Sequence, residues 1–217
     1  MKGMYDLHTH TVLSDGELVP AELIRRMAVV GYTTVAITDH ADHSNYEAVL
    51  SALDRMREPA GACGVRLLCG IEITHVPPEL IGPMATSAKA LGADIVVVHG
   101  ESPVEPVAPG TNHAACSCRD VDVLAHPGLI TPEDAKLAAK NGIALEITSR
   151  GGHNRTNGHV ALAGKKAGCQ LVVDSDAHGP GDIMDERARK LVARGAGLTE
   201  KECKQVLCLN IEKFLKA

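Results

Sequence analysis

Seven short apolar runs, rich in Val, Ile and Leu, recur along the 217-residue chain with helical patterns between them. Such runs are typical of strands in a parallel sheet, because helices cover both faces of that sheet and leave no face polar. The predicted strands are Met4–Leu7, Thr34–Ile37, Arg66–Ile71, Asp94–Val98, Val121–Leu124, Ile143–Ile147 and Leu171–Val173. Strands that alternate with helices predict an α/β fold, either a parallel sheet or a barrel.

Segments with helical patterns fill the spaces between these strands. The predicted helices are Pro20–Val30, Asn45–Arg57, Met84–Leu91, Pro132–Lys140, Gly158–Ala167 and Asp182–Arg194. A capping box at Thr199–Glu202 predicts a final helix that runs to about Leu215. The segment from Gly100 to about Asn112 contains three prolines and no periodic pattern, so we predict a long loop, either functional or merely exposed.

Composition narrows the class of protein. No shift in composition marks a second domain, so residues 1–217 are predicted to form one domain. The net charge of −5 and the absence of a basic run argue against an extended nucleic-acid partner. No stretch of the chain is apolar for long enough to span a membrane, and the N-terminus has no apolar signal core, so a cytoplasmic protein is expected. Nothing in the sequence indicates the oligomeric state.

The seven cysteines are scattered and contain no Cys-x-x-Cys pair, which makes a disulfide framework or a cysteine-rich zinc site a poor interpretation. Cys116 and Cys118 could ligate a metal, but we expect them to be ordinary reduced thiols.

Six of the seven predicted strands end in or lead into His, Asp or Glu side chains. These residues are His8, His10, Asp39, His40, Glu72, His99, His126, Asp174, Asp176 and His178. In a βα barrel the chemistry gathers at the carboxyl ends of the strands. One such histidine alone is more often structural, but burying this many ionisable groups without a cation costs several kcal/mol per ion. The pattern therefore predicts a multinuclear site for Zn²⁺, Mn²⁺ or Fe²⁺ rather than Ca²⁺.

The order of the polar motifs resembles the PHP (polymerase and histidinol phosphatase) family over nearly the whole chain. The motifs are Asp6-Leu7-His8-Thr9-His10, Ser14-Asp15-Gly16, Thr38-Asp39-His40, Gly70-Ile71-Glu72, His99-Gly100, Ala125-His126-Pro127 and Asp176-Ala177-His178. The resemblance implies a distorted seven-stranded (β/α)7 TIM-like barrel with two or three divalent metal ions.

The resemblance also implies nine metal ligands. The first ion would be held by His8, His10, Glu72 and Asp176, the second by Glu72, His99 and His126, and the third by Asp15, His40 and His178. Asp15 could instead cap the helix that follows it. Asp39 is expected to orient a ligand histidine rather than to bind a metal.

In this family the nucleophile would be a hydroxide that bridges two metals, so no side-chain nucleophile is needed. The sequence contains neither a phosphate-binding glycine loop with lysine nor a Gly-x-Ser-x-Gly elbow. His178 or His40 could protonate the leaving alkoxide.

The sixth predicted strand supplies no obvious ligand and leads into a glycine-containing segment with Arg150 and Arg155. We predict that Arg150, and then Arg155, clamps the phosphate of a substrate, although a solvated surface loop is an equal alternative. The remaining histidines are predicted to lie at the surface or to support the ligands; they are His43, His75, His113, His153 and His159.

Four functions fit the motifs to different degrees. Hydrolysis of a small phosphomonoester such as histidinol phosphate is favoured, and a nuclease or nucleotide phosphodiesterase is the alternative, although no basic or aromatic-rich insertion supports it. Amidohydrolase barrels also begin with His-x-His, but that resemblance implies eight strands and a modified lysine where this chain has His99. A scaffold or RNA-binding relative without metals conflicts with nine intact motif positions.

Overall fold

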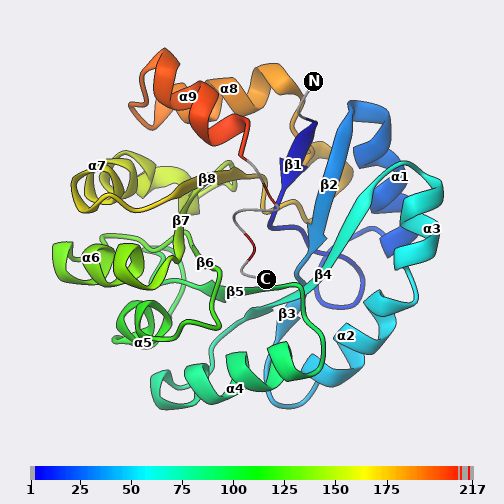
Figure 1. The fold of residues 1–217 in the computed structure, drawn as a ribbon, viewed down its shortest axis with the longest axis horizontal. Coiled ribbons are helices and arrows are strands. Elements are labelled where there is room, and N and C mark those ends of the chain that lie inside the picture. The colour runs from blue at the N-terminus through cyan, green and yellow to red at the C-terminus, as the bar shows by residue number, and fades with distance from the viewer. Residues whose placement is uncertain (1–2, 210, 212–214, 216–217) are drawn as a thin grey trace.

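Seven parallel strands form a nearly closed barrel in the computed structural model, which describes residues 3–209, 211 and 215 (Figure 1). In barrel order they are β1 (Met4–Asp6), β2 (Tyr32–Ile37), β4 (Arg66–Ile73), β5 (Ile95–His99), β6 (Val123–Ala125), β7 (Ala144–Thr148) and β8 (Leu171–Asp174). An isolated parallel bridge between Thr9 and Ala177 joins the first strand to the last. The predicted α/β barrel of seven strands is confirmed, with one short addition, β3 (His40–Ala41), which pairs with β4.

Helices surround the strands (Figure 1). They are α1 (Pro20–Val30), α2 (Tyr46–Asp54), α3 (Arg57–Ala62), α4 (Pro78–Ala90), α5 (Thr111–Ser117), α6 (Pro132–Asn141), α7 (Asn157–Ala167), α8 (Glu186–Gly195) and α9 (Glu200–Leu207), with the 3₁₀ turns η1 (His153–Thr156) and η2 (Pro180–Asp182). The threonine-capped starts of α6 and α9 are confirmed, because the Thr131 and Thr199 side chains accept hydrogen bonds from backbone N–H groups three residues later.

Several predicted helix boundaries were wrong. The segment predicted as one helix over Asn45–Arg57 is divided into α2 and α3, and α8 begins at Glu186 after the cap residue Asp185. Helix α4 begins at Pro78 and contains Pro83, so this proline removes one backbone hydrogen bond without ending the helix. Helix α5 was not predicted at all. Helix α9 ends at Leu207, and part of the predicted extension to Leu215 lies outside the described residues.

The inner surface of the barrel is apolar through most of its depth. Its buried members are Tyr5, Leu7, Ala36, Leu68, Ile95, Val97, Val123, Ala125, Ala144, Val172 and Ile211. Alternate residues of the same strands, such as Val96 and Val98, belong to a second and larger core that includes the buried faces of the helices. The chain after α9 therefore returns to the barrel, where Ile211 packs among residues of the first strands.

The seven cysteines are free thiols. Cys116 is buried, and burial raises the pKa of its thiol well above the usual value. Within the described residues, no helix combines the length and apolar character that a membrane crossing requires.

Candidate metal centre

His8 and His10 reach the mouth of the barrel on a segment that continues past the end of β1. The backbone N–H of Asp176 donates to the carbonyl of His8 at 3.0 Å, and that of His10 donates to the carbonyl of Ala177 at 2.8 Å. The two motifs from opposite ends of the sequence thus run side by side. This pairing, rather than strand β1 itself, places both histidines beside Asp176.

Two buried carboxylates, those of Asp6 and Asp174, connect these segments on the barrel side of the mouth. Asp6 accepts hydrogen bonds from the backbone N–H groups of His8 and Ser175, each at 3.2 Å, and Asp174 accepts from that of Leu7 at 2.8 Å. Burial raises the pKa of Asp6 to about 6, although the hydrogen bonds from Ser175 and the charge of buried Arg189 oppose the rise. The first and last strands are therefore fixed to one another directly beneath the predicted ligands.

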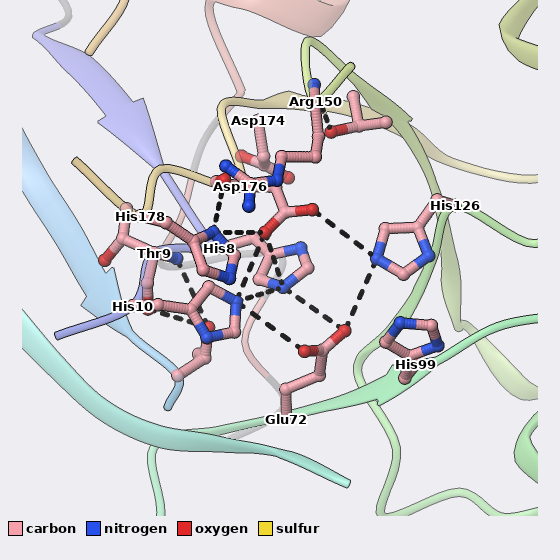
Figure 2. A network of polar contacts seen from close by, with 12 residues as sticks. His8, Thr9, His10, Glu72, His99, His126, Arg150, Asp174, Asp176 and His178 are labelled. Atoms are coloured by element: carbon pink, nitrogen blue, oxygen red, sulfur yellow. Dashed lines mark hydrogen bonds and ion pairs between the residues drawn. The ribbon is translucent and has the colours of Figure 1, made fainter. Parts of the chain in front are cut away.

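Four buried side chains gather at the centre of the mouth, as Figure 2 shows. His8 Nε2 lies 3.0 Å from His10 Nε2 and 3.3 Å from Glu72 Oε1, and His10 Nε2 lies 3.2 Å from Asp176 Oδ1. Two atoms bound to one ion at about 2.0–2.1 Å lie roughly 2.9 Å apart at a right angle and roughly 3.3 Å apart at the tetrahedral angle. The spacing of these side chains fits the shell of a single ion.

Unpaired buried atoms provide an independent test of this fit. Both carboxylate oxygens of Glu72 are buried and make no well-aligned hydrogen bond, although Oε2 lies 2.7 Å from His40 Nδ1 and Oε1 lies 3.3 Å from His8 Nε2. Nδ1 of His10 and Nδ1 of His126 are also buried without a hydrogen-bond partner. Such atoms are costly unless something replaces the lost water. Burial alone would raise the pKa of Glu72, but the imidazoles of His8 and His40 outweigh it and hold that pKa well below the usual range. A negative, buried and unsaturated carboxylate at the centre of four imidazoles suits a divalent cation.

A second group, on the solvent side of His10, contains the residues predicted to hold the third ion, Asp15, His40 and His178. Asp15 Oδ1 lies 3.3 Å from His178 Nε2 and 3.6 Å from His40 Nε2, and its side chain is 56% exposed. The alternative in which Asp15 caps a helix is excluded, because Val19 is the N-cap residue of α1 and α1 has no side-chain cap.

The predicted role of Asp39 was wrong in part. Its carboxylate accepts hydrogen bonds from the backbone and hydroxyl of Thr11 and from the hydroxyl of Ser14, all within 2.7–2.8 Å. Asp39 thus positions the loop that carries Asp15 rather than a histidine.

His99 and His126 form a third group, with ring centres 4.4 Å apart. His126 Nε2 lies 3.5 Å from Glu72 Oε1 and 3.6 Å from Asp176 Oδ2, so these two carboxylates of the first group also face the third group. Within the described residues, only His75, His126 and Asp176 are non-glycine residues with positive φ. Such backbone strain persists where surrounding structure enforces it, and it concentrates at functional sites.

The sixth predicted strand, which was expected to supply no obvious ligand, carries a buried carboxylate that contacts one of the ligands. Glu146 of β7 is fully buried; it lies 2.7 Å from His8 Nδ1 and accepts a hydrogen bond from the backbone N–H of His126 at 2.9 Å. A carboxylate bonded to the far nitrogen of a histidine fixes the ring so that its other nitrogen can face a metal. A single charged residue inside the apolar run Ile143–Ile147 was the available signal.

His153 and Glu105 were also missed. His153 is buried, and one of its ring nitrogens lies within 4.8 Å of nitrogens of His99 and His126. Glu105 comes from the predicted loop and lies 3.0 Å from His99 Nε2. The other non-motif histidines, His43, His75, His113 and His159, belong to no group of possible metal ligands among the described residues.

The two arginines have different surroundings. Arg150 lies beside the Asp174 and Asp176 side of the cluster in Figure 2, and its Nη1 contacts Asp182 Oδ2 at 3.3 Å. Asp182 also accepts hydrogen bonds from the backbone of His178 and Gly179. Arg155 is exposed on η1, and its side chain makes no hydrogen bond or ion pair within the described part of the chain.

A parallel barrel with buried His, Asp and Glu groups at its carboxyl mouth is typical of metal-dependent hydrolases of the barrel type. A model of the PHP domain family matches residues 6–175, and the chain belongs to this family of metal-dependent phosphoesterases. The match ends immediately before Asp176, so Asp176 and His178 are placed by the structure alone.

Three relatives cover nearly the same length as this chain. An uncharacterised protein of Methanocaldococcus jannaschii is 47% identical over 98% of both chains. Ribonuclease P protein component 3 of Methanosarcina mazei is 27% identical over 98% of this chain and 88% of its own length. A probable phosphatase of Shewanella piezotolerans is 32% identical over 82% of this chain and 79% of its own length.

Among solved structures, the fold is similar to that of histidinol phosphate phosphatase from Lactococcus lactis, crystallised with zinc, L-histidinol and phosphate. The TM-score is 0.64, with 13% identity over 90% of this chain and 94% of the other. At that identity the likeness concerns the fold.

Proposed function

We propose that this protein hydrolyses a small phosphomonoester, such as histidinol phosphate, with two or three Zn²⁺, Mn²⁺ or Fe²⁺ ions at the mouth of the barrel. One observation carries the proposal: the buried carboxylate of Glu72 lies among the imidazoles of His8, His10, His40 and His126 at distances suited to metal coordination, and the other predicted ligands gather beside this centre. The phosphatase relative and the structural likeness to a histidinol phosphate phosphatase support the choice of a monoester.

Bound ions would lower the pKa of an attacking water and offset the charge on the phosphoryl oxygens. The protein's own residues orient the metal ligands and bind the substrate. Glu146, Asp6 and Asp174 fix the orientation of His8 and its neighbours, which keeps the site preorganised. Arg150 is suited to bind two phosphoryl oxygens through its planar guanidinium after leaving Asp182. Arg155, on the exposed surface of η1, is a weaker candidate for the same purpose.

His40 and His178 are the candidates for protonating the leaving oxygen. Their side chains are 27% and 12% exposed, whereas those of His8 and His10 are fully buried, so only the former pair can exchange protons with solvent. Burial alone would lower the pKa of His40, but the Glu72 and Asp15 carboxylates raise it to about 9 in the protein without metal. Both histidines are also proposed metal ligands, so either imidazole would donate a proton to an alkoxide only from a nitrogen that holds no ion.

The test is reconstitution of metal-free protein with Mn²⁺, Zn²⁺ or Fe²⁺, followed by assays on histidinol phosphate, other monoesters and a simple phosphodiester. Elemental analysis should find at least two ions per chain, and kcat/KM should be highest for a monoester. Fewer than one ion per chain in metal-supplemented medium, with no activity on any ester, would refute the proposal. A preference for the diester would instead identify a phosphodiesterase that uses the same site.

A further inference from the structure

The long loop after β5 and the turn after β7 meet above His99 and His126, outside the nine motif positions. Gly152, with φ +91°, precedes η1, and a Cβ built there would lie 3.3 Å from Val104 Cγ1. This close approach brings the loop tip, with Glu105, against the residue before His153. The sequence places these two segments far apart, and neither is part of a strand.

His153 is held firmly at this position. Its side chain is only 8% exposed, and its ring centre lies 4.3 Å from that of His126 and 5.8 Å from that of His99. Asn157 binds both the N–H and the carbonyl of Thr148, and the N–H of Asn154 donates to the carbonyl of Arg150. These bonds fix η1 to the end of β7, so the ring lies over His126 in a defined orientation.

The free nitrogens around His153 point to a cation. His99 Nδ1 lies 3.1 Å from the carbonyl of Gly100, and an Nδ1–H that donates there leaves the Nε2 lone pair free for a metal. Nδ1 of His153 and Nδ1 of His126 are buried without partners. One ring nitrogen from each of His99, His126 and His153 lies within 4.8 Å of the others, and the Nε2 atoms of His99 and His153 both face Glu105, so these rings could share one ion.

Glu105 supplies a carboxylate at the same place. Its Oε2 lies 3.0 Å from His99 Nε2 and its Oε1 lies 3.3 Å from His153 Nε2. The base of its loop is tied down because Glu101 and Asn112 bind one another's backbone N–H groups at 3.0 Å, and Asn112 also donates to the carbonyl of Pro127. The tip is more open, since the Glu105 side chain is 36% exposed.

We propose that His153 and Glu105 are two further ligands of the metal ion that His99 and His126 bind. This inference rests on the proposed function in one respect, namely that the mouth of the barrel binds metal ions. An ion with imidazoles from His99, His126 and His153 has a nitrogen-rich shell, in contrast to the first group with its two carboxylates. Glu105, the ligand on the open loop tip, is the one that a substrate phosphoryl oxygen can replace without disturbing the barrel.

The experiment measures metal binding by the complete protein without reference to activity. Co²⁺ and Zn²⁺ are titrated into metal-free protein in competition with a chromophoric chelator, and the visible spectrum of the Co²⁺ form is recorded. His153→Ala should weaken one class of site by about 10-fold or more, the scale on which residues near a metal act, and should alter the Co²⁺ bands. Glu105→Gln should weaken metal binding at the same class of site. Because Glu105 lies on a partly exposed loop, this variant keeps the test available if His153→Ala folds poorly.

His43→Asn is the control. His43 is exposed, its ring lies 6.5 Å from that of Tyr46, and it is in no group of possible ligands among the described residues. The metal affinities of this variant should be unchanged. The inference is overturned if His153→Ala binds both metals like the wild type, or if His43→Asn weakens binding equally. If the wild type binds two ions, these outcomes concern only the roles of His153 and Glu105. If the wild type binds none, the proposed function itself has failed.

Discussion

The two ends of the barrel interior are built from the same strands but bury side chains of opposite character, apolar at one end and ionisable at the other. Toward the amino ends, Leu68 of β4 and Val97 of β5 are buried among aliphatic neighbours. Further along the same inward-facing rows, Glu72 and His99 are buried among ionisable groups. The apolar end stabilises the protein by removing surface from water. The polar end opposes folding unless a cation compensates for the buried charges.

The sharpest way to test this contrast is Glu72→Ala. Because Glu72 lies between the first and third ligand groups, its loss should release at least one metal ion per chain and lower kcat/KM on the order of 10³-fold. Elemental analysis and steady-state kinetics measure the two effects. Glu79→Ala, at an exposed acidic position in α4, is the control and should change neither. Full metal content in Glu72→Ala would contradict the central position of this carboxylate.

At the apolar end, Leu68→Ala should affect stability and leave the metals in place. Leu68 is 1% exposed, and truncating a buried leucine costs about 2–5 kcal/mol because a cavity remains. Denaturant unfolding of metal-free protein gives this value. Leu80→Ala, at a 40% exposed position, should change stability by less than about 0.5 kcal/mol. If Leu68→Ala lost metal while fully folded, the two ends would not be independent.

Arg150→Ala tests the side of the mouth assigned to substrate. Metal content should remain unchanged, and kcat/KM on a monoester should fall on the order of 10²-fold, about 3 kcal/mol of transition-state stabilisation. Arg150→Lys should recover only part of the loss, because an ammonium lacks the two-pronged geometry. Arg25→Ala, on the exposed face of α1, is the control.

Two results would go against the assignment of Arg150 as a clamp. One is retention of more than half of the wild-type kcat/KM in Arg150→Ala, and the other is a loss that parallels loss of metal. A diester carries one negative charge fewer, so the defect should be smaller on diesters. A larger defect on diesters would favour a phosphodiesterase.

Glu146→Gln should have the smallest effect of the four. The amide keeps the shape of the side chain and can still accept from the N–H of His126, but it withdraws the negative charge beside His8. Metal affinity should fall by about 10- to 100-fold, the usual cost of losing a partner of a ligand histidine. Competition with a chelator measures it, and Gln170→Glu, at an exposed residue before β8, is a charge control that should leave affinity unchanged.

The strands and motif positions could be predicted from sequence because each depends on local pattern. The apolar runs identified all seven barrel strands, and the motif residues at their ends come together as expected. The short β3 was missed because two residues carry no periodicity. Helix α4 was predicted to begin after Pro83, since proline normally disfavours a helix interior, yet the helix tolerates it.

The missed site residues have a different cause. His153 lies in a 3₁₀ turn, and Glu105 lies in a proline-rich loop, so neither is placed by strand alternation. Their position over His99 depends on contacts between two loops distant in sequence, which no local pattern records. Glu146 could have been recognised as a charge within an apolar strand, but it lies inside β7, whereas ligands were expected at strand ends.

The return of the chain to the barrel interior has a consequence for biosynthesis. The Tyr5 hydroxyl donates to the carbonyl of Val206 at 2.6 Å, and Ile211 belongs to the same buried apolar cluster as Leu7 and Leu68. A ribosome delivers Tyr5 roughly two hundred residues before these partners, at about 5–20 residues per second. The first strand therefore waits many seconds with apolar surface open to water. Until the residues around Val206 have emerged, this apolar surface is available for aggregation.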